Sequence, residues 1–216
     1  MVQQPSNPSP ASVDHLVYAT LDLDRGMREI EDLLGVRATA GGRHPGRGTR
    51  NALLALGDGV YLEIIGPDPD QPPPPSARWF GIDTLTSSRL TAWAAKSSDV
   101  DGLRDRAVRQ GIALGNVQAG SRRQPDGVEL SWRFTDPGHV VDDGIVPFFI
   151  DWGQSPHPSR SAAKGATLVE LRAEHPRDRD IEWMFQILGI QVPVSAAPGP
   201  ALVAIVEGRL GRVELR

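Results

Sequence analysis

The strongest constraint on the fold is a pattern that occurs twice in the first 153 residues. In each copy a strand-like apolar segment precedes an amphipathic helix, and three more strand-like segments follow. The first copy predicts strands at 13–20, 36–40, 52–56 and 60–65, with a helix at 23–34. The second predicts strands at 90–96, 112–117, 128–134 and 146–152, with a helix at 100–110. An internal repeat of this kind indicates two copies of one βαβββ unit.

The same pattern divides the chain into units. We expect a disordered N-terminal lead at 1–12, a first module at 13–67 and a second module at 89–157. The segment 68–88 joins them, and its four consecutive prolines at 72–75 exclude both a helix and a central strand. Residues 165–216 repeat the start of the pattern and are predicted to form a partial module, a C-terminal α/β appendage.

Composition excludes several classes of function. The net charge of -4 argues against a nucleic-acid partner, which calls for a basic face. There is no cysteine, so disulfides and thiolate metal sites are excluded. No apolar run has the length of a membrane span, and the first ten residues lack the features of a signal peptide. No nucleotide or flavin motif is present. We therefore expect a cytoplasmic protein without a nucleic-acid or membrane partner.

Two polar residues stand inside the apolar runs of the first unit. His15 begins the run 14–19, and Glu63 lies in the middle of the run 60–66. A carboxylate is costly to bury unless it is paired or binds a metal. The plain alternative for Glu63 is an ion pair with Arg43 or Arg50, and for His15 a hydrogen-bonded core position. We predict that both residues are functional.

Several phrases of the sequence resemble one family. They are Asp14-His15-Leu16-Val17-Tyr18, Gly41-Gly42-Arg43-His44, Gly48-Thr49-Arg50-Asn51, Tyr61-Leu62-Glu63, Trp132, and Pro147-Phe148-Phe149-Ile150-Asp151-Trp152. Together they resemble the glyoxalase-like branch of the vicinal-oxygen-chelate superfamily, which includes glyoxalases, bleomycin-resistance proteins and dioxygenases. The resemblance covers residues 13–157. It implies an α+β fold in which paired βαβββ modules form a cupped mixed sheet.

The resemblance also implies a site inside the cup. The first and fourth strands of a module would be neighbours, so that His15 and Glu63 face the cup together and act as catalytic residues. A divalent metal ion is implied on His15, Glu63 and His44, although zinc, nickel, manganese and iron are not distinguished. The implied substrate-binding residues are Thr49, Asn51, Tyr61, Trp132, Phe148, Asp151 and Trp152.

The second module departs from the metal pattern of the family. Aligning the helix starts places Thr91 opposite His15, and threonine is a poor ligand. Aligning Gly66 with Gly153 places Ile150 opposite Glu63. Only a two-residue shift of this alignment would bring Asp151 into the phase of a metal ligand.

The other polar candidates outside the two runs are less specific. His157 is expected in a loop, and His139 and His175 are expected at the surface. Arg122 and Arg123 are interpreted as a solvated hairpin tip, with closure over an anionic substrate as the alternative.

Three functions follow from the resemblance. The first is a glyoxalase-like enzyme with lyase or isomerase chemistry on a substrate with two neighbouring oxygens. The second is a protein that binds or sequesters a small molecule without chemistry, which the missing histidine of the second module favours. The third is a non-haem iron dioxygenase that uses His15 and His44 together. Proteins with this fold commonly pair their modules, and on that basis we also predict a homodimer.

Overall fold

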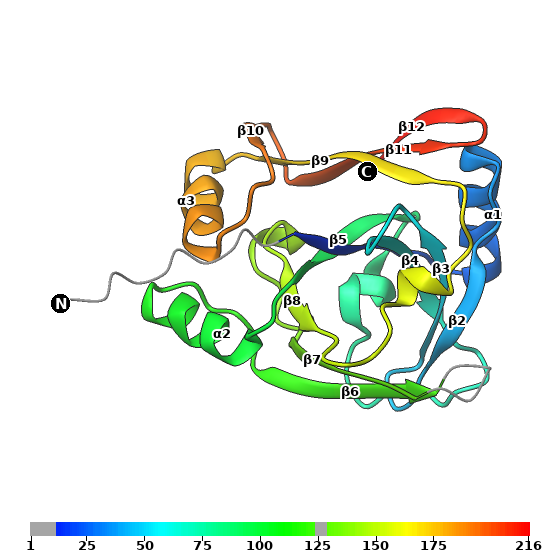
Figure 1. Cartoon of the computed structure of the whole chain (residues 1–216), viewed down its shortest axis with the longest axis horizontal. Coiled ribbons are helices and arrows are strands. Elements are labelled where there is room, and N and C mark those ends of the chain that lie inside the picture. The colour runs from blue at the N-terminus through cyan, green and yellow to red at the C-terminus, as the bar shows by residue number, and fades with distance from the viewer. Residues whose placement is uncertain (1–11, 124–128) are drawn as a thin grey trace.

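A curled eight-stranded sheet forms the body of the protein (Figure 1). The computed structural model describes residues 12–123 and 129–216. The first half of the sheet comprises β1 (Val13–Ala19), β2 (Thr39–His44), β3 (Thr49–Ala55) and β4 (Tyr61–Pro67), with α1 (Leu23–Leu34) after β1. The second half comprises β5 (Arg89–Lys96), β6 (Val117–Arg123), β7 (Glu129–Thr135) and β8 (Phe148–Asp151), with α2 (Val100–Arg109) after β5. Both halves therefore have the expected element order.

The strand order shows how the two halves are joined. It runs β2-β3-β4-β1-β5-β8-β7-β6, with β1 parallel to β4, β5 parallel to β8, and β1 antiparallel to β5. At the outer edges the Arg122 side chain of β6 donates a hydrogen bond to the carbonyl of Gly41 in β2, at 3.3 Å. The sheet is thus curled and nearly closed. The predicted α+β fold with two βαβββ modules is confirmed.

Local signals explain why α1 lies where it does. Asp22 caps its first turn by accepting from the backbone N–H of Arg25, and Gly35 ends it with φ of 68°. The buried residues Leu23, Ile30 and Leu34 form the stripe that faces the sheet. The helix therefore covers one side of the first module and leaves its concave side open.

The Gly-rich stretch 41–51 forms the tip of a hairpin between β2 and β3. His44 pairs with Thr49 across the hairpin, so both flanks of the stretch are strand. The register shifts between Ala40 and Arg43, which marks a β-bulge at Gly41 and Gly42. This hairpin brings His44 to the side of the sheet that carries Glu63.

The C-terminal residues form a second sheet. It consists of β9 (Thr167–His175), β10 (Val194–Ala196), β11 (Ala201–Gly208) and β12 (Gly211–Leu215), in the order β10-β9-β11-β12, with α3 (Asp178–Leu188) after β9. The element order again resembles a module, but the pairing differs. Here the first strand pairs with the second and third, whereas in the two modules it pairs with the fourth. The described residues also include three short 3-10 helices: η1 (Trp79–Thr84), η2 (Asp142–Gly144) and η3 (Pro158–Arg160).

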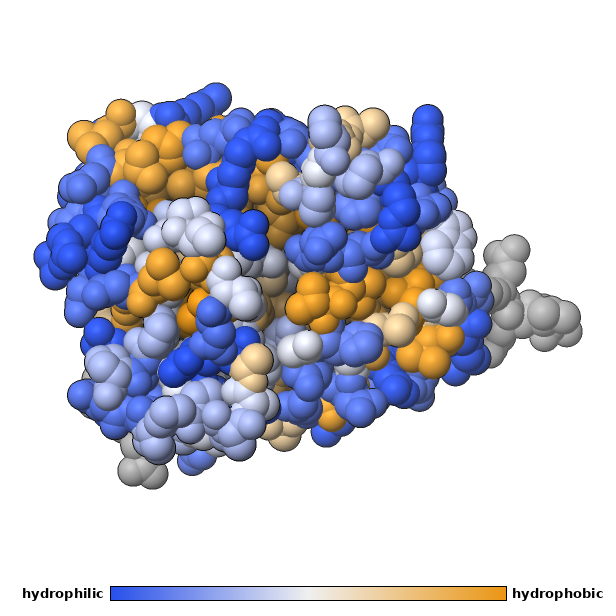
Figure 2. Space-filling model, turned by 180° about the vertical axis from the view of Figure 1, so that it is seen from behind, coloured by the Kyte–Doolittle hydropathy of each residue, from blue (hydrophilic) through white to orange (hydrophobic). Residues whose placement is uncertain are grey.

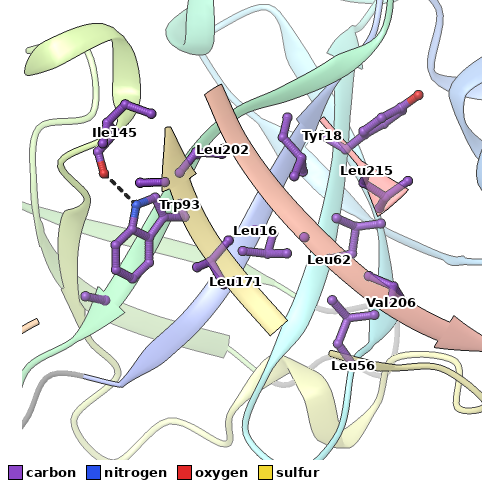
Figure 3. Close-up of a cluster of buried hydrophobic side chains, with 14 of the residues drawn as sticks. Leu16, Tyr18, Leu56, Leu62, Trp93, Ile145, Leu171, Leu202, Val206 and Leu215 are labelled. Carbon is purple, nitrogen blue, oxygen red and sulfur yellow. Dashed lines mark hydrogen bonds between the residues drawn. The ribbon is translucent and has the colours of Figure 1, made fainter. Parts of the chain in front are cut away.

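The main hydrophobic core lies between the two sheets. Figure 3 shows Leu16 of β1 and Leu62 of β4 facing Leu171 of β9 and Val206 of β11. Trp93 of β5 is fully buried there, and its indole N–H donates to the carbonyl of Ile145 at 2.8 Å. The C-terminal sheet therefore covers the outer face of the large sheet, and the inner face remains for a site.

The surface carries no single broad apolar area on the face in Figure 2, where apolar patches alternate with charged side chains. Large exposed apolar side chains lie on separate elements, for example Leu21, Val140 and Trp183. In the described part of the chain, none of the helices is both long enough and apolar enough to cross a membrane. A homodimer stays a prediction.

Candidate functional site

The concave side of the large sheet holds a cavity of about 70 Å³. Eight of the predicted site residues line it: His15, His44, Asn51, Tyr61, Glu63, Trp132, Phe148 and Trp152. A larger cavity of about 260 Å³ lies beside η2 and the start of β5. Of the predicted residues only Phe148 lines that one. The chemistry therefore points to the smaller cavity, which we call the cup.

His15 owes its orientation to a β-bulge. The register of β1 against β5 shifts between Val13 and His15, which leaves Asp14 as the extra residue. Neighbouring strand residues normally point to opposite faces, but the bulge allows Asp14 Oδ1 to lie 2.7 Å from His15 Nδ1. A carboxylate only accepts, so Nδ1 carries the proton. Nε2 of His15 then faces the cup, 3.9 Å from Glu63 Oε2.

Asp14 is the most enclosed charged group of the site. It has no exposed surface, and its carboxylate also accepts from His157 Nε2 at 3.1 Å and from Trp152 Nε1 at 3.2 Å. Burial alone would raise the pKa of Asp14, but the hydrogen bonds and charges of His15 and His157 outweigh it and hold the pKa well below the ordinary value. Asp14 is therefore ionised at neutral pH and anchors three aromatic side chains.

Glu63 is held by an amide. Asn51 Nδ2 donates to Glu63 Oε1 at 2.5 Å, while Asn51 Oδ1 accepts from the backbone N–H of Gly42 at 2.7 Å. The backbone N–H of Gly42, in the β-bulge, thus fixes the orientation of the Asn51 amide. Arg43 and Arg50 pair elsewhere, with Asp68 and Asp24, so the ion pair considered for Glu63 does not form.

His44 approaches Glu63 from the opposite side. Its Nε2 lies 3.9 Å from Glu63 Oε1 and 3.4 Å from Asn51 Nδ2, and its Nδ1 lies 2.9 Å from Thr49 Oγ1. Because the amide nitrogen donates, Nε2 accepts and Nδ1 donates to Thr49. Burial lowers the pKa of His44, and it outweighs the opposing effect of Glu63. His44 is therefore neutral at pH 7.

Aromatic rings close the rest of the cup. Tyr61 stacks on His15 with ring centres 4.6 Å apart, and Phe148 meets His15 edge-on at 5.4 Å. Trp132 and Trp152 lie against each other at 5.1 Å. Burial raises the pKa of Tyr61 well above its ordinary value, and the charges of Asp14 and Glu63 add to that effect. Tyr61 therefore keeps its phenolic proton.

Two predicted residues lie outside the cup. Thr49 is buried behind His44 and contacts it through the hydroxyl. Asp151 accepts from the backbone N–H of Gly153 and does not line the cavity, whereas its neighbour Ile150 does. Thr49 is thus placed to orient His44, and Asp151 is placed in a turn.

The register identifies the second-module counterparts of the polar pair. His15 pairs with Tyr61 and Ala94 pairs with Phe148, and His15 and Ala94 pair with each other. Ala94, rather than Thr91, is therefore the counterpart of His15. Ile150 follows Phe148 by two residues, as Glu63 follows Tyr61. At these two positions the second module therefore has apolar side chains, and the first module has polar ones.

Sequence reasoning missed several residues of the site. Asp14 and His157 form the anchor of His15, and Trp79 and Phe80 line the cup, as does Arg122, for which closure over a substrate was the alternative prediction. The one available signal was the adjacency of Asp14 and His15 in a strand-like run. His175 was expected at the surface but is buried, and its Nδ1 accepts from the backbone N–H of Arg177. Arg122 and Arg123, interpreted as a hairpin tip, lie at the end of β6, and Gln124 to Val128 beyond them lie outside the described residues.

Comparison with known protein families agrees with this architecture. The model of a family described as glyoxalase-like domain matches residues 13–189, well over half of the chain. The chain belongs to the glyoxalase-like domain family. This membership and the strand topology confirm the resemblance to vicinal-oxygen-chelate proteins. The matched region also extends beyond the two modules into the C-terminal sheet and α3. No curated protein matches the chain.

Solved structures with a similar fold are distant in sequence. A hypothetical protein from Staphylococcus aureus is 13% identical over 94% of this chain and 84% of its own, with a TM-score of 0.63. Methylmalonyl-CoA epimerase from Mycobacterium tuberculosis is 22% identical over 68% of this chain and 91% of its own, with a TM-score of 0.42. A variant of the Streptomyces coelicolor methylmalonyl-CoA epimerase in complex with 2-nitronate-propionyl-CoA is 19% identical over 69% of this chain and 100% of its own, at 0.43. These likenesses concern the fold.

Proposed function

We propose that this glyoxalase-like protein is an enzyme that acts on a small molecule with two neighbouring oxygens and uses a divalent metal ion. The observation that carries the proposal is the surrounding of Glu63. Nε2 atoms of two histidines face its two oxygens at 3.9 Å each, and in the neutral tautomers that Asp14 and Asn51 favour both nitrogens would present lone pairs. Among the described residues no lysine or arginine forms an ion pair with Glu63. A bound cation would accept electron pairs from these nitrogen and oxygen atoms and would balance the charge of Glu63.

The donor set fits such an ion in type. Imidazole nitrogen and carboxylate oxygen are common ligands of zinc, iron and related metals. Two atoms bound to one ion at about 2.1 Å in tetrahedral geometry lie about 3.4 Å apart, so each 3.9 Å separation would shorten by about 0.5 Å when the ion binds. The hydrogen bonds of Asp14 and Thr49 to the Nδ1 atoms are the outer contacts that metal-binding histidines usually have. Within the described residues, no three such side chains already share one point.

The residues of the cup would have separate roles in the reaction. When bound, a divalent ion polarises substrate oxygens and stabilises the negative charge that develops on them. Glu63 is placed to accept a proton from the substrate, since only one of its oxygens takes a strong hydrogen bond. Tyr61, Phe148 and the two tryptophans Trp132 and Trp152 exclude water and confine the substrate. Asp14 holds His15 so that Nε2 stays directed into the cup.

The test is the metal content of protein purified without chelator, measured by elemental mass spectrometry. We expect about one transition metal per chain in the wild type and a large loss in Glu63→Gln, which keeps the shape of the side chain and an acceptor for Asn51. Asp151→Asn, a carboxyl change outside the cup, serves as the matched control and should keep its metal. Absence of metal in the wild type after reconstitution would contradict the proposal.

A second assay addresses the reaction. Proton NMR in D₂O would follow exchange at the carbon next to a carbonyl or hydroxyl in a panel of small oxygenated compounds. Exchange that Glu63→Gln abolishes supports isomerase or lyase chemistry. Iron as the bound metal together with oxygen consumption would instead select the dioxygenase, for which His15 and His44 are both present.

One observation favours a binding protein without chemistry as the second candidate. Ala94 and Ile150 occupy the positions at which the second module would supply further polar groups. Under this alternative His15, His44, Asn51 and Glu63 serve as hydrogen-bonding anchors. Tight ligand binding that is insensitive to chelator, with no turnover, would establish it.

A further inference from the structure

Arg122 is unusual among the arginines of this protein. Most described arginines lie within 4 Å of a carboxylate, as Arg43 and Arg133 do. Arg122 has no ion-pair partner in the part of the chain that the structure describes, although it is half-buried and lines the cup beside Glu63. A guanidinium that is neither paired nor fully solvated is costly to keep unless something else neutralises it.

The position of Arg122 is built by the two edge strands. Its Nη1 donates to the carbonyl of Gly41 at 3.3 Å and so bridges β6 to β2. A side chain at Gly42 would approach the guanidinium closely, because a Cβ there would lie 3.2 Å from Nη1. The bulge in β2 therefore leaves room for Arg122. Among the described residues one of its five N–H donors has an acceptor, and the other donors can bind a planar anion through two parallel hydrogen bonds.

Within the described part of the chain, two carboxylates and two arginines surround the cup. Asp14 and Glu63 are the acids of the site, and Arg122 and Arg47 oppose them at the rim. Arg47 is held in place by the ring of Trp79, 4.1 Å from its guanidinium carbon, and by Gln118.

We infer that the substrate is a small 2-hydroxy or 2-oxo carboxylate whose carboxylate is bound by Arg122. This inference rests on the proposed function, because the oxygen next to the carboxylate is the one that faces His15 and Glu63. The walls of the cup are otherwise mostly aromatic and aliphatic, and its volume of about 70 Å³ has room for a few heavy atoms. Arg122 thereby selects an anion, and the small cup selects a short one.

The test uses oxalate, a planar carboxylate with neighbouring oxygens, and oxamide, its neutral counterpart of the same shape. Binding to metal-free protein is followed by the fluorescence of the tryptophans that wall the cup. We expect oxalate to bind and oxamide to bind at least 10-fold more weakly. Arg122→Gln should weaken oxalate binding by about 10- to 100-fold, as expected for loss of a charge-assisted pair. Arg122→Lys should retain part of the affinity, and higher salt should weaken binding to the wild type.

Arg109→Gln is the matched control, because Arg109 lies exposed at the end of α2, away from the cup. It should bind oxalate as the wild type does. Equal oxalate affinity in Arg122→Gln and wild type, equal affinity for oxamide, or no oxalate binding at all would each overturn the inference. Because the assay is metal-free, its failure is separate from failure of the metal proposal, which depends on the metal content of Glu63→Gln.

Discussion

Asp14 shows how much of the site depends on one buried carboxylate. It receives hydrogen bonds from His15, Trp152 and His157, which come from both modules and from the segment after β8. A fully buried charge is tolerated only with such partners. Asp14 thus sets the tautomer of His15 and ties the two modules together at the cup.

We expect Asp14→Asn to destabilise the protein by about 3 kcal/mol, because the amide presents donors to groups that already donate. Urea unfolding followed by circular dichroism measures this change. Asp151→Asn, whose carboxylate serves one turn N–H, is expected to cost less than about 1 kcal/mol. Similar losses in the two variants would show that Asp14 has no special role.

The sequence indicated His15 and Glu63 because polar residues interrupted apolar runs. It did not indicate Asp14 as a partner of His15, since alternation along a strand places neighbours on opposite faces. The β-bulge at Asp14 makes an exception to this alternation, and it arises from the pairing of β1 with β5. The two strands are about 80 residues apart in the sequence and meet only in the folded sheet. The same limit applies to Arg122, whose approach to Gly41 depends on closure of the sheet.

At the scale of elements, the hairpin of β2 and β3 positions His44, Thr49 and Asn51. Its bulge at Gly41 and Gly42 has a specific cause, because a Cβ at Gly41 would lie 2.2 Å from Asn51 Oδ1. Only glycine leaves the amide where it can bind both the Gly42 N–H and Glu63. The hairpin is therefore a support for Glu63 as well as the source of His44.

Asp68 at the end of β4 holds this hairpin in place. Its backbone N–H donates a hydrogen bond to the carbonyl of Gly48. Its buried carboxylate accepts a hydrogen bond from the side-chain amide of Gln71 and lies 3.4 Å from Arg43 Nε. Burial alone would raise the pKa of Asp68, but the hydrogen bonds from Gln71 and Asp70 and the charge of Arg43 lower it below 3.8. The folded protein therefore releases this proton more readily than the unfolded chain.

The resulting pH dependence has a definite sign. The contribution of Asp68 is fully present above the unfolded pKa and is lost as the pH falls through the lower folded pKa. We expect Asp68→Asn to be less stable than the wild type at pH 7, and this difference to shrink below about pH 4. Urea midpoints at several pH values test this. Asp32→Asn, an exposed change on α1, should show no such convergence, and a difference that stays constant to pH 3 would contradict the assignment.

At the scale of the molecule, the two sheets share one core. Trp93 of β5 packs edge-on against Phe185 of α3, with ring centres 6.3 Å apart, and the backbone N–H of Leu90 donates to the carbonyl of Arg216 at 2.7 Å. The C-terminal sheet covers the outer face of the strands that carry the cup (Figure 1). We expect the chain to unfold as one unit.

Phe185→Ala tests this coupling. Phe185 is 2% exposed, so its truncation should cost about 3–5 kcal/mol, with fluorescence and circular dichroism reporting the same transition. Trp183→Ala on the exposed side of the same helix should cost far less, since Trp183 is 47% exposed. Two separate transitions in the wild type would show that the C-terminal sheet folds independently.

Periodicity within the sequence was sufficient for the βαβββ repeat and for singling out His15 and Glu63, because these depend on neighbours along the chain, and the family resemblance supplied the α+β class. Tertiary structure alone decided that Ala94 is the counterpart of His15, that Thr49 supports His44, and that Asp14, His157 and Arg122 join the cup. Each of these depends on strand register, bulges or sheet closure between distant segments. Such contacts follow from how the sheet packs and curls, which no local pattern records.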